Sequence, residues 1–136
     1  MPADIQQLPP LLYPLANRFY RAFQRGTKAG NQHLVWVGKE HEQIVSALCL
    51  QPTANGHWLT SLLVAPEHRR QGLAAALLGH IRQQYSGPIW LFCAPELSTL
   101  YHRAGYEATK DLPESLQDRL ARYQRHKRLI ALVSRS

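Results

Sequence analysis

LLVAPEHRRQGLAAA, residues Leu62–Ala76, is the stretch that determines the fold predicted for this chain. An apolar, strand-like run leads through Pro66 into a turn with two cations, Arg69 and Arg70, and then to Gly72 and an apolar helical pattern. A helix N-terminus has unpaired backbone N–H groups and partial positive charge. A glycine there exposes the main chain, because no Cβ stands between it and a phosphate. The stretch therefore predicts a strand, a turn and a helix that together bind a phosphate or pyrophosphate.

Two common phosphate-binding motifs do not fit this stretch. A Walker-type loop needs Gly-Lys-Ser/Thr, which does not follow here, and a dinucleotide fingerprint needs more glycines than Gly72 alone. The alternative is a plain strand-to-helix turn, in which the glycine allows close packing and the two arginines are solvated. Taken alone, the stretch leaves both interpretations open.

Upstream of this stretch, the apolar periodicity changes from helical to strand-like. After a turn-like lead-in at Pro2–Pro10, apolar residues recur every three or four positions over Leu11–Phe23, which predicts an amphipathic helix. Three β-branched and aromatic runs with short polar connections follow. They predict an antiparallel meander of strands at His33–Gly38, Gln43–Leu50 and His57–Val64, with a turn at Pro52–Gly56.

Downstream of it, helices and strands alternate. An apolar stripe predicts a helix over Gln71–Tyr85, and the continuous apolar run Ile89–Cys93 predicts a strand buried on both faces. Because this strand follows a strand and a helix, it is expected to run parallel to the first one. The remaining expected elements are a helix at Glu96–Arg103 ended by Gly105, a strand starting at Tyr106–Ala108, a helix at Pro113–Arg125 and a strand at Leu129–Val133.

The composition is that of a globular domain. The chain has 136 residues, of which 45% are hydrophobic and 18% charged, and we expect residues 1–136 to form a single domain. Its two cysteines, Cys49 and Cys93, lie in apolar runs and are expected to be buried free thiols. No apolar run approaches the roughly 18 residues of a membrane span. The first residues also lack a signal-peptide pattern, so we predict a cytoplasmic protein with no membrane partner.

The formal net charge of +7 favours anionic partners in general. The excess is greatest at the C-terminal end, where no acidic residue follows Asp118. Segment 119–128 is basic, with Tyr123 interleaved, which admits a nucleic-acid binder as an alternative function. A solvated cationic face is the other interpretation, and nucleic acid is not the expected partner. The seven histidines form no HExxH motif or close ligand cluster, so no metal is expected.

Two motifs resemble those of one enzyme family. The pattern VxPxxRRxGxA over Val64–Ala74 resembles the acetyl-CoA signature of the GNAT N-acetyltransferase family, whose core is Arg/Gln-x-x-Gly-x-Gly/Ala. Downstream, the run LYHRAGY over Leu100–Tyr106 resembles the second marker of the family, a Tyr four residues before a Gly-aromatic pair. The resemblance covers about Trp58–Tyr106. It implies an α/β fold with a mixed, mostly antiparallel, splayed sheet flanked by helices.

The resemblance also implies acetyl-CoA as co-substrate, without a metal. The cofactor would lie where the strands His57–Val64 and Ile89–Cys93 separate. The backbones of Leu62, Leu63 and Val64 would hydrogen-bond the pantetheine arm, as an added strand does. The pyrophosphate would be bound by the turn and the helix start, through Arg69, Arg70, Gln71, Gly72, Leu73 and Ala74.

The activity implied is a transferase reaction, in which the acetyl group passes directly from acetyl-CoA to a primary amine. Such a reaction passes through a tetrahedral oxyanion, which a backbone amide near Leu63 or Val64 would stabilise. By its place in the second marker, Tyr101 is the expected catalytic residue, which gives the leaving thiolate a proton or a hydrogen bond. The alternative role for Tyr101 is packing on the sheet. Tyr106 is expected to pack.

The sequence departs from the family pattern at two places. Members often carry a Glu on the third strand as general base, whereas the matching stretch Leu59–Leu62 has no carboxylate. His57, or water held by Thr60 or Ser61, would have to replace it. Many members also have an Asn after the parallel strand, where this chain has Cys93-Ala94-Pro95. These departures leave a catalytically weak CoA-binding sensor as an alternative function.

The segments expected to form the acceptor site have the least recognisable sequence pattern. In this fold the acceptor site is built by the first helix and the segment before the last strand, here Leu11–Arg25 and Asp111–Lys127. Neither carries a recognisable motif, so the expectation stays at a small-molecule or peptide amine. The last strand is a candidate surface for a homodimer.

Overall fold

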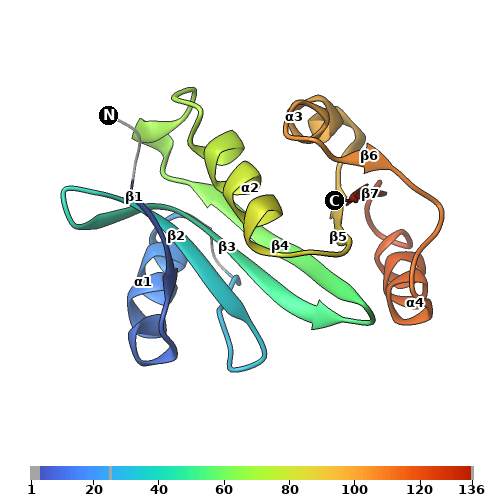
Figure 1. The fold of residues 1–136 in the computed structure, drawn as a ribbon, viewed down its shortest axis with the longest axis horizontal. Helices are drawn as coiled ribbons and strands as arrows, with labels where there is room; N and C mark the ends of the chain where they lie inside the picture. The colour runs from blue at the N-terminus through green and yellow to red at the C-terminus, as the bar shows by residue number, and fades with distance from the viewer. Residues whose placement is uncertain (1–3, 25, 136) are drawn as a thin grey trace.

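The computed structural model describes residues 4–24 and 26–135 of the chain. Within them, seven strands form one sheet in the order β1-β2-β3-β4-β5-β7-β6 (Figure 1). Neighbouring strands are antiparallel, except that β4 and β5 are parallel. The strands are β1 (Asp4–Leu8), β2 (Leu34–Glu40), β3 (Gln43–Thr53), β4 (Gly56–Val64), β5 (Ile89–Cys93), β6 (Glu107–Ala108) and β7 (Ile130–Ser134).

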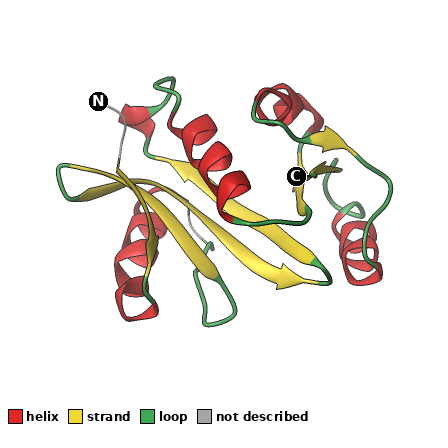
Figure 2. Cartoon of the chain, viewed as in Figure 1, coloured by secondary structure: helices red, strands yellow, loops and turns green. Residues whose placement is uncertain are grey.

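Helices cover both faces of the sheet (Figure 2). Those of the described residues are α1 (Tyr13–Phe23), α2 (Leu73–Gln84), α3 (Ser98–Arg103) and α4 (Glu114–Tyr123). Apolar residues of α2 and α3 pack in one cluster with strand residues such as Leu48, Leu59 and Leu91. On the opposite face, α1 packs on β2 and β3, and α4 packs on β5 and β7. The burial of these faces is the main source of the stability of the fold.

The predicted fold class is confirmed: the sheet is mixed, mostly antiparallel and flanked by helices. The meander, the parallel strand after α2 and the helix ended by Gly105 are present, and Gly105 has a φ of +97°. β5 has the predicted bounds, and the other predicted helices and strands shift by a few residues at their ends.

The prediction for the N-terminal lead-in was wrong. Asp4–Leu8 is not turn-like but forms β1, which pairs antiparallel with β2 along one edge of the sheet. Its sequence lacks an apolar alternation because most of this edge strand stays in contact with solvent, and Leu8 is its one buried residue in the described part. Residues 1–3 lie outside the described residues.

The predicted turn at Pro52–Gly56 is also shorter than expected, because β3 continues through Pro52 to Thr53. A proline is tolerated there since β2 pairs with β3 only as far as Leu50, so the missing N–H costs no ladder hydrogen bond on that side.

Two further findings concern the thiols and the helices. Cys49 and Cys93 are buried and free, as the sequence predicts. Among the described helices, none combines the length and the apolar character that a membrane crossing requires.

Candidate functional site

The parallel strands β4 and β5 separate halfway along the sheet. They pair only where His57–Leu59 faces Ile89–Leu91, and β4 then continues to Val64 without β5 beside it. The separation predicted for these strands is therefore present. Beyond Leu59, one edge of β4 has backbone N–H and C=O groups that no neighbouring strand satisfies, which is the arrangement that accepts an extended ligand as an added strand.

The free part of β4 begins with a β-bulge. Ala47 pairs with Leu63 and Cys49 pairs with Thr60, so Ser61 and Leu62 together face the single residue Leu48 of β3. Ser61 has a φ of +61°, a left-handed conformation that residues other than glycine rarely adopt. The bulge turns the backbone of β4 at the point where the strands part.

The turn after β4 leads into the N-terminus of α2. Arg69 Nε donates a hydrogen bond to the Val64 carbonyl at 3.2 Å, which ties the turn to the end of the strand. Gly72 is the N-cap of α2 and has a φ of +77°, a conformation that glycine adopts without steric cost. Apart from its neighbours along the chain, an added Cβ at Gly72 would meet no atom of the described residues within 4 Å, because the space in front of it is open.

The start of α2 has the features that can receive an anion. The Gly72 N-cap makes no side-chain hydrogen bond to the helix, so the first N–H groups of α2 are not capped by the chain itself. Arg69 and Arg70 are exposed on the adjoining turn, where they add two full positive charges to the partial charge of the helix end.

These features surround one pocket of about 480 Å³. All the residues predicted to bind the cofactor or to act in catalysis line this pocket, except Gln71, which is exposed on the turn. The lining residues are Gln24, Leu62, Leu63, Val64, His68, Arg69, Arg70, Gly72, Leu73, Ala74, Ala75, Leu97, Leu100 and Tyr101.

Some lining residues were missed at the sequence level. Leu97 and Leu100 are 49% and 36% exposed, unusually open for leucines, and they form an apolar wall of the pocket beside Tyr101. Leu97 and Leu100 are three residues apart, and Tyr101 follows Leu100. This helical spacing could have predicted that the three side chains lie on one side of the helix. Gln24 and His68 carry no such signal, because only the tertiary fold brings them to the pocket.

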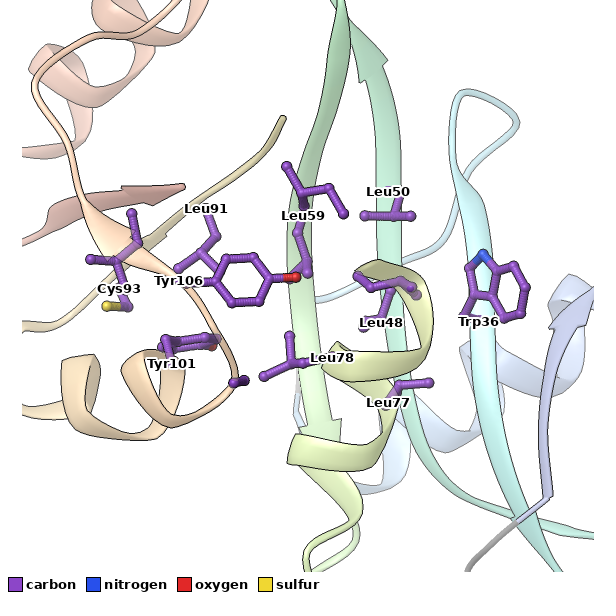
Figure 3. Close-up of a cluster of buried hydrophobic side chains, with 14 residues drawn as sticks. Trp36, Leu48, Leu50, Leu59, Leu77, Leu78, Leu91, Cys93, Tyr101 and Tyr106 are labelled. Atoms are coloured by element: carbon purple, nitrogen blue, oxygen red, sulfur yellow. The ribbon is translucent and has the colours of Figure 1, made fainter. Parts of the chain in front are cut away.

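Tyr101 reaches the pocket from α3 and is 7% exposed. Burial raises the pKa of its phenol to about 12, and the nearby Cys93 adds to the rise. The phenol therefore stays protonated at neutral pH and can donate a hydrogen bond. Figure 3 shows Tyr101 near Cys93 and Leu78, on the side of the strand gap that α3 occupies.

Tyr106 lies deeper than Tyr101 and is 0% exposed. The two rings meet edge to face, with centroids 6.2 Å apart. Figure 3 shows the Tyr106 ring between Leu91 of β5 and Leu59 of β4, so it fills the space where the strands begin to part. Its hydroxyl is buried and has no hydrogen-bond partner among the described residues. Tyr106 thus packs between the strands and does not line the pocket.

Two residues with potentially reactive side chains, His57 and Cys93, lie away from the pocket or are blocked. His57 is at the opposite end of β4 from Val64, beside Ile89, and its ring contacts Tyr85. Cys93 is buried, and its burial, with the charge of Glu96, raises the pKa of the thiol, so it is held in the unreactive protonated form. Within residues 4–24 and 26–135, no group of three or more His, Cys, Asp or Glu side chains is placed to hold a metal ion.

The pocket fits acetyl-CoA by the shape of its parts. The free edge of β4 can pair with the amide groups of an extended pantetheine arm, and Leu97 and Leu100 can cover its apolar atoms. The open space at Gly72, the N-terminus of α2 and the two arginines match a pyrophosphate.

The comparisons with known proteins agree with this geometry. A family model described as an acetyltransferase (GNAT) domain matches residues 31–108. No curated protein sequence matches the chain significantly.

Similar folds occur among solved structures. An N-acetylglutamate synthase from Neisseria gonorrhoeae, complexed with coenzyme A and N-acetyl-glutamate, has a TM-score of 0.72 and 15% identity over 98% of this chain. This chain spans only 35% of that synthase. The ribosomal-protein-S18-alanine N-acetyltransferase from Escherichia coli has a TM-score of 0.67 and 17% identity over 96% of this chain and 90% of its own. An aminoglycoside 6'-N-acetyltransferase complexed with coenzyme A has a TM-score of 0.71 and 11% identity over 96% of each chain.

At these identities the solved structures establish the fold, while the family model covers more than half of the sequence. The chain belongs to the GNAT acetyltransferase family.

Proposed function

We propose that this chain transfers the acetyl group of acetyl-CoA directly to a primary amine of a small molecule or peptide. The observation that carries the proposal is a single pocket that joins the free edge of β4, the cationic turn before α2 and the buried phenol of Tyr101. Residues 1–136 act as one acetyltransferase domain in this proposal.

The binding roles follow from the backbone. The edge of β4 over Leu62–Val64 pairs with the pantetheine arm, and the first N–H groups of α2 receive the pyrophosphate. Because Arg69 uses its Nε on the Val64 carbonyl, its remaining N–H groups and the Arg70 side chain supply the counter-charge. Gln71 contributes through its backbone, since it does not line the pocket itself.

The chemical roles fall to a backbone amide and a phenol. Bound acetyl-CoA supplies the thioester whose carbonyl carbon the amine attacks. A backbone N–H of β4 near Leu63 or Val64 stabilises the negative charge that develops on the carbonyl oxygen. Tyr101 donates a hydrogen bond to the sulfur as the C–S bond breaks, and its raised pKa keeps the proton available for that bond.

Among the described residues that line the pocket, the one imidazole is that of His68, whose Nδ1 lies 3.9 Å from Glu40 Oε2. None of the described residues that line the pocket carries a carboxylate, and His57 lies at the far end of β4. We therefore propose that the proton of the attacking amine passes to solvent, so that the free-base form of the amine is the reactive species.

The experiment that tests the proposal is a panel of primary amines incubated with acetyl-CoA and the full chain. The panel contains amino acids, aminoglycosides, diamines and peptides with free N-termini, and the readouts are free thiol and acetylated amine by mass spectrometry. We expect at least one amine to be acetylated with stoichiometric release of CoA. Tight binding of acetyl-CoA with no acetylated amine from any class would contradict the proposal and favour the CoA-binding sensor.

A further inference from the structure

We propose that Tyr20 is a positioning residue for acetyl transfer, whose hydroxyl holds the β4 bulge in the conformation that points its amides into the pocket. The inference rests on the proposed function and concerns a residue of α1, far in the sequence from either family motif. Tyr20 does not line the pocket and would act only through the backbone of β4.

The contact that carries the inference is a buried hydrogen bond. Tyr20 is 0% exposed, and its hydroxyl donates to the Ser61 carbonyl at 2.8 Å. The same hydroxyl also lies 3.7 Å from the buried Cys49 sulfur, within hydrogen-bond distance for sulfur. Burial raises the pKa of the Tyr20 phenol far above its ordinary value, so the hydroxyl remains a donor at every physiological pH.

Ser61 has the strained backbone conformation that the hydrogen bond from Tyr20 can stabilise. Its φ of +61° is unfavourable for a residue with a Cβ, so the bulge persists only where surrounding contacts hold it. A relaxed Ser61 would return toward ordinary strand geometry and shift the register of Leu62 and Leu63, which line the pocket.

The hydrogen bond to the Ser61 carbonyl also constrains Leu62, the next residue, which lines the pocket. The Ser61 carbonyl and the Leu62 N–H belong to one planar peptide, and no cis peptide bond occurs in the described residues. Fixing the carbonyl toward α1 therefore fixes the direction of the Leu62 N–H, and with it the start of the next peptide. Tyr20 thus orients the peptide that directly precedes the amides of Leu63 and Val64, from which the oxyanion donor comes.

A second tyrosine of α1 provides a matched control. The Tyr13 hydroxyl also donates to a backbone carbonyl, that of His33, at 2.6 Å, and Tyr13 is 7% exposed. His33 precedes β2 and does not line the pocket. The two tyrosines therefore have the same helix, the same chemistry and similar burial, and they differ in which carbonyl they hold.

The test compares Tyr20→Phe with Tyr13→Phe in the full chain, using acetyl-CoA and the best amine of the panel. We expect Tyr20→Phe to lower kcat about tenfold, less than the roughly 100-fold loss of a whole oxyanion donor, because the amide is loosened and not removed. KM for acetyl-CoA should stay within about twofold, since the turn at α2 is untouched. Tyr13→Phe should leave both constants within about twofold of the wild type.

A second readout does not depend on turnover. Backbone ¹⁵N relaxation of Leu62 and Leu63 should report order parameters near about 0.85 in the wild type and in Tyr13→Phe, and below about 0.6 in Tyr20→Phe. If Tyr20→Phe is poorly folded alone, the three proteins are compared with saturating acetyl-CoA, which stabilises the native state by mass action.

The outcomes separate the two proposals. Equal effects of the two substitutions on kcat and on the order parameters would overturn the role of Tyr20 and leave it a structural residue. A wild type that acetylates no amine would overturn the proposed function, while the order parameters would still decide whether Tyr20 holds the bulge.

Discussion

The two faces of the sheet differ in how their function is encoded. On the face covered by α2 and α3, the contacts proposed for the cofactor rely largely on backbone groups: the edge of β4, the N-cap Gly72 and the first turn of α2. On the opposite face, α1 and α4 contribute side chains, as when Arg119 lies 4.6 Å over the Trp58 ring. Backbone sites demand special residues at fixed spacing, whereas side-chain sites use ordinary residues brought together by the fold.

This difference explains why the predicted cofactor residues could be identified from the sequence, whereas the contacts on the opposite face could not. A turn that exposes N–H groups favours glycine at a position of positive φ, and such a preference leaves a motif in the sequence. A stacked arginine or a buried tyrosine hydroxyl leaves none, because its partner can lie anywhere along the chain. If the two faces are separate, a substitution on one face should leave the contacts of the other unchanged.

The largest expected difference lies between two neighbouring tyrosines. Tyr101→Phe should lower kcat about 100-fold, because the leaving sulfur loses its hydrogen-bond donor. Tyr106→Phe should leave kcat within about twofold, and thermal unfolding should show equal or higher stability, because it removes a buried hydroxyl without a partner in the described residues. Steady-state kinetics on both variants checks this. An equal loss in the two variants would mean that Tyr101 acts through packing.

The pH dependence is expected to follow the amine and not the protein. With no carboxylate among the described lining residues, kcat/KM should rise about tenfold per pH unit between about pH 6 and 9, as the free-base form of an amine with a pKa near 10.4 increases. The activity should show no falling limb in this range, because Tyr101 loses its proton only near a pKa of about 12. A plateau reached well below the pKa of the acceptor amine would instead mean that a side chain of the protein accepts the proton.

The smallest effect is expected on the face that carries α4. Arg119→Gln removes the cation–π contact with Trp58 and should lower the free energy of unfolding by about 0.5–1 kcal/mol. Arg122→Gln, at an exposed position of the same helix, should change it by less than about 0.5 kcal/mol. Urea denaturation followed by tryptophan fluorescence measures both. Acetyl-CoA affinity should be unchanged in either variant, and a loss of affinity in Arg119→Gln would show that the faces are coupled.

The sequence was sufficient for the elements with strong periodicity and for the turn with special residues. The run Ile89–Cys93 is buried on both faces, and its composition alone identifies it as a strand. The strand β1 was missed because a largely polar edge strand has no apolar alternation. The hydrogen bond of Tyr20 to Ser61 joins residues 41 positions apart, and no local pattern reports such a contact.

The bulge illustrates the same limit within the site. The stretch His57–Val64 was correctly predicted as a strand, but nothing in its sequence indicates that Ser61 adopts a positive φ. A glycine would have marked the position. Here the conformation is supported by a tertiary hydrogen bond, so an ordinary serine occupies it.

The most direct measurement of the central claim is a calorimetric titration of acetyl-CoA into the wild type, Gly72→Glu and Gly26→Glu. Both glycines have positive φ and open space where a Cβ would stand, and only Gly72 lines the pocket with Arg69 and Arg70. The backbone strain of the two substitutions is therefore matched. We predict micromolar binding to the wild type and to Gly26→Glu, and at least about 100-fold weaker binding to Gly72→Glu, whose carboxylate occupies the phosphate position. No binding to the wild type, or equal binding to the two variants, would contradict the assignment of the turn before α2 as the pyrophosphate site.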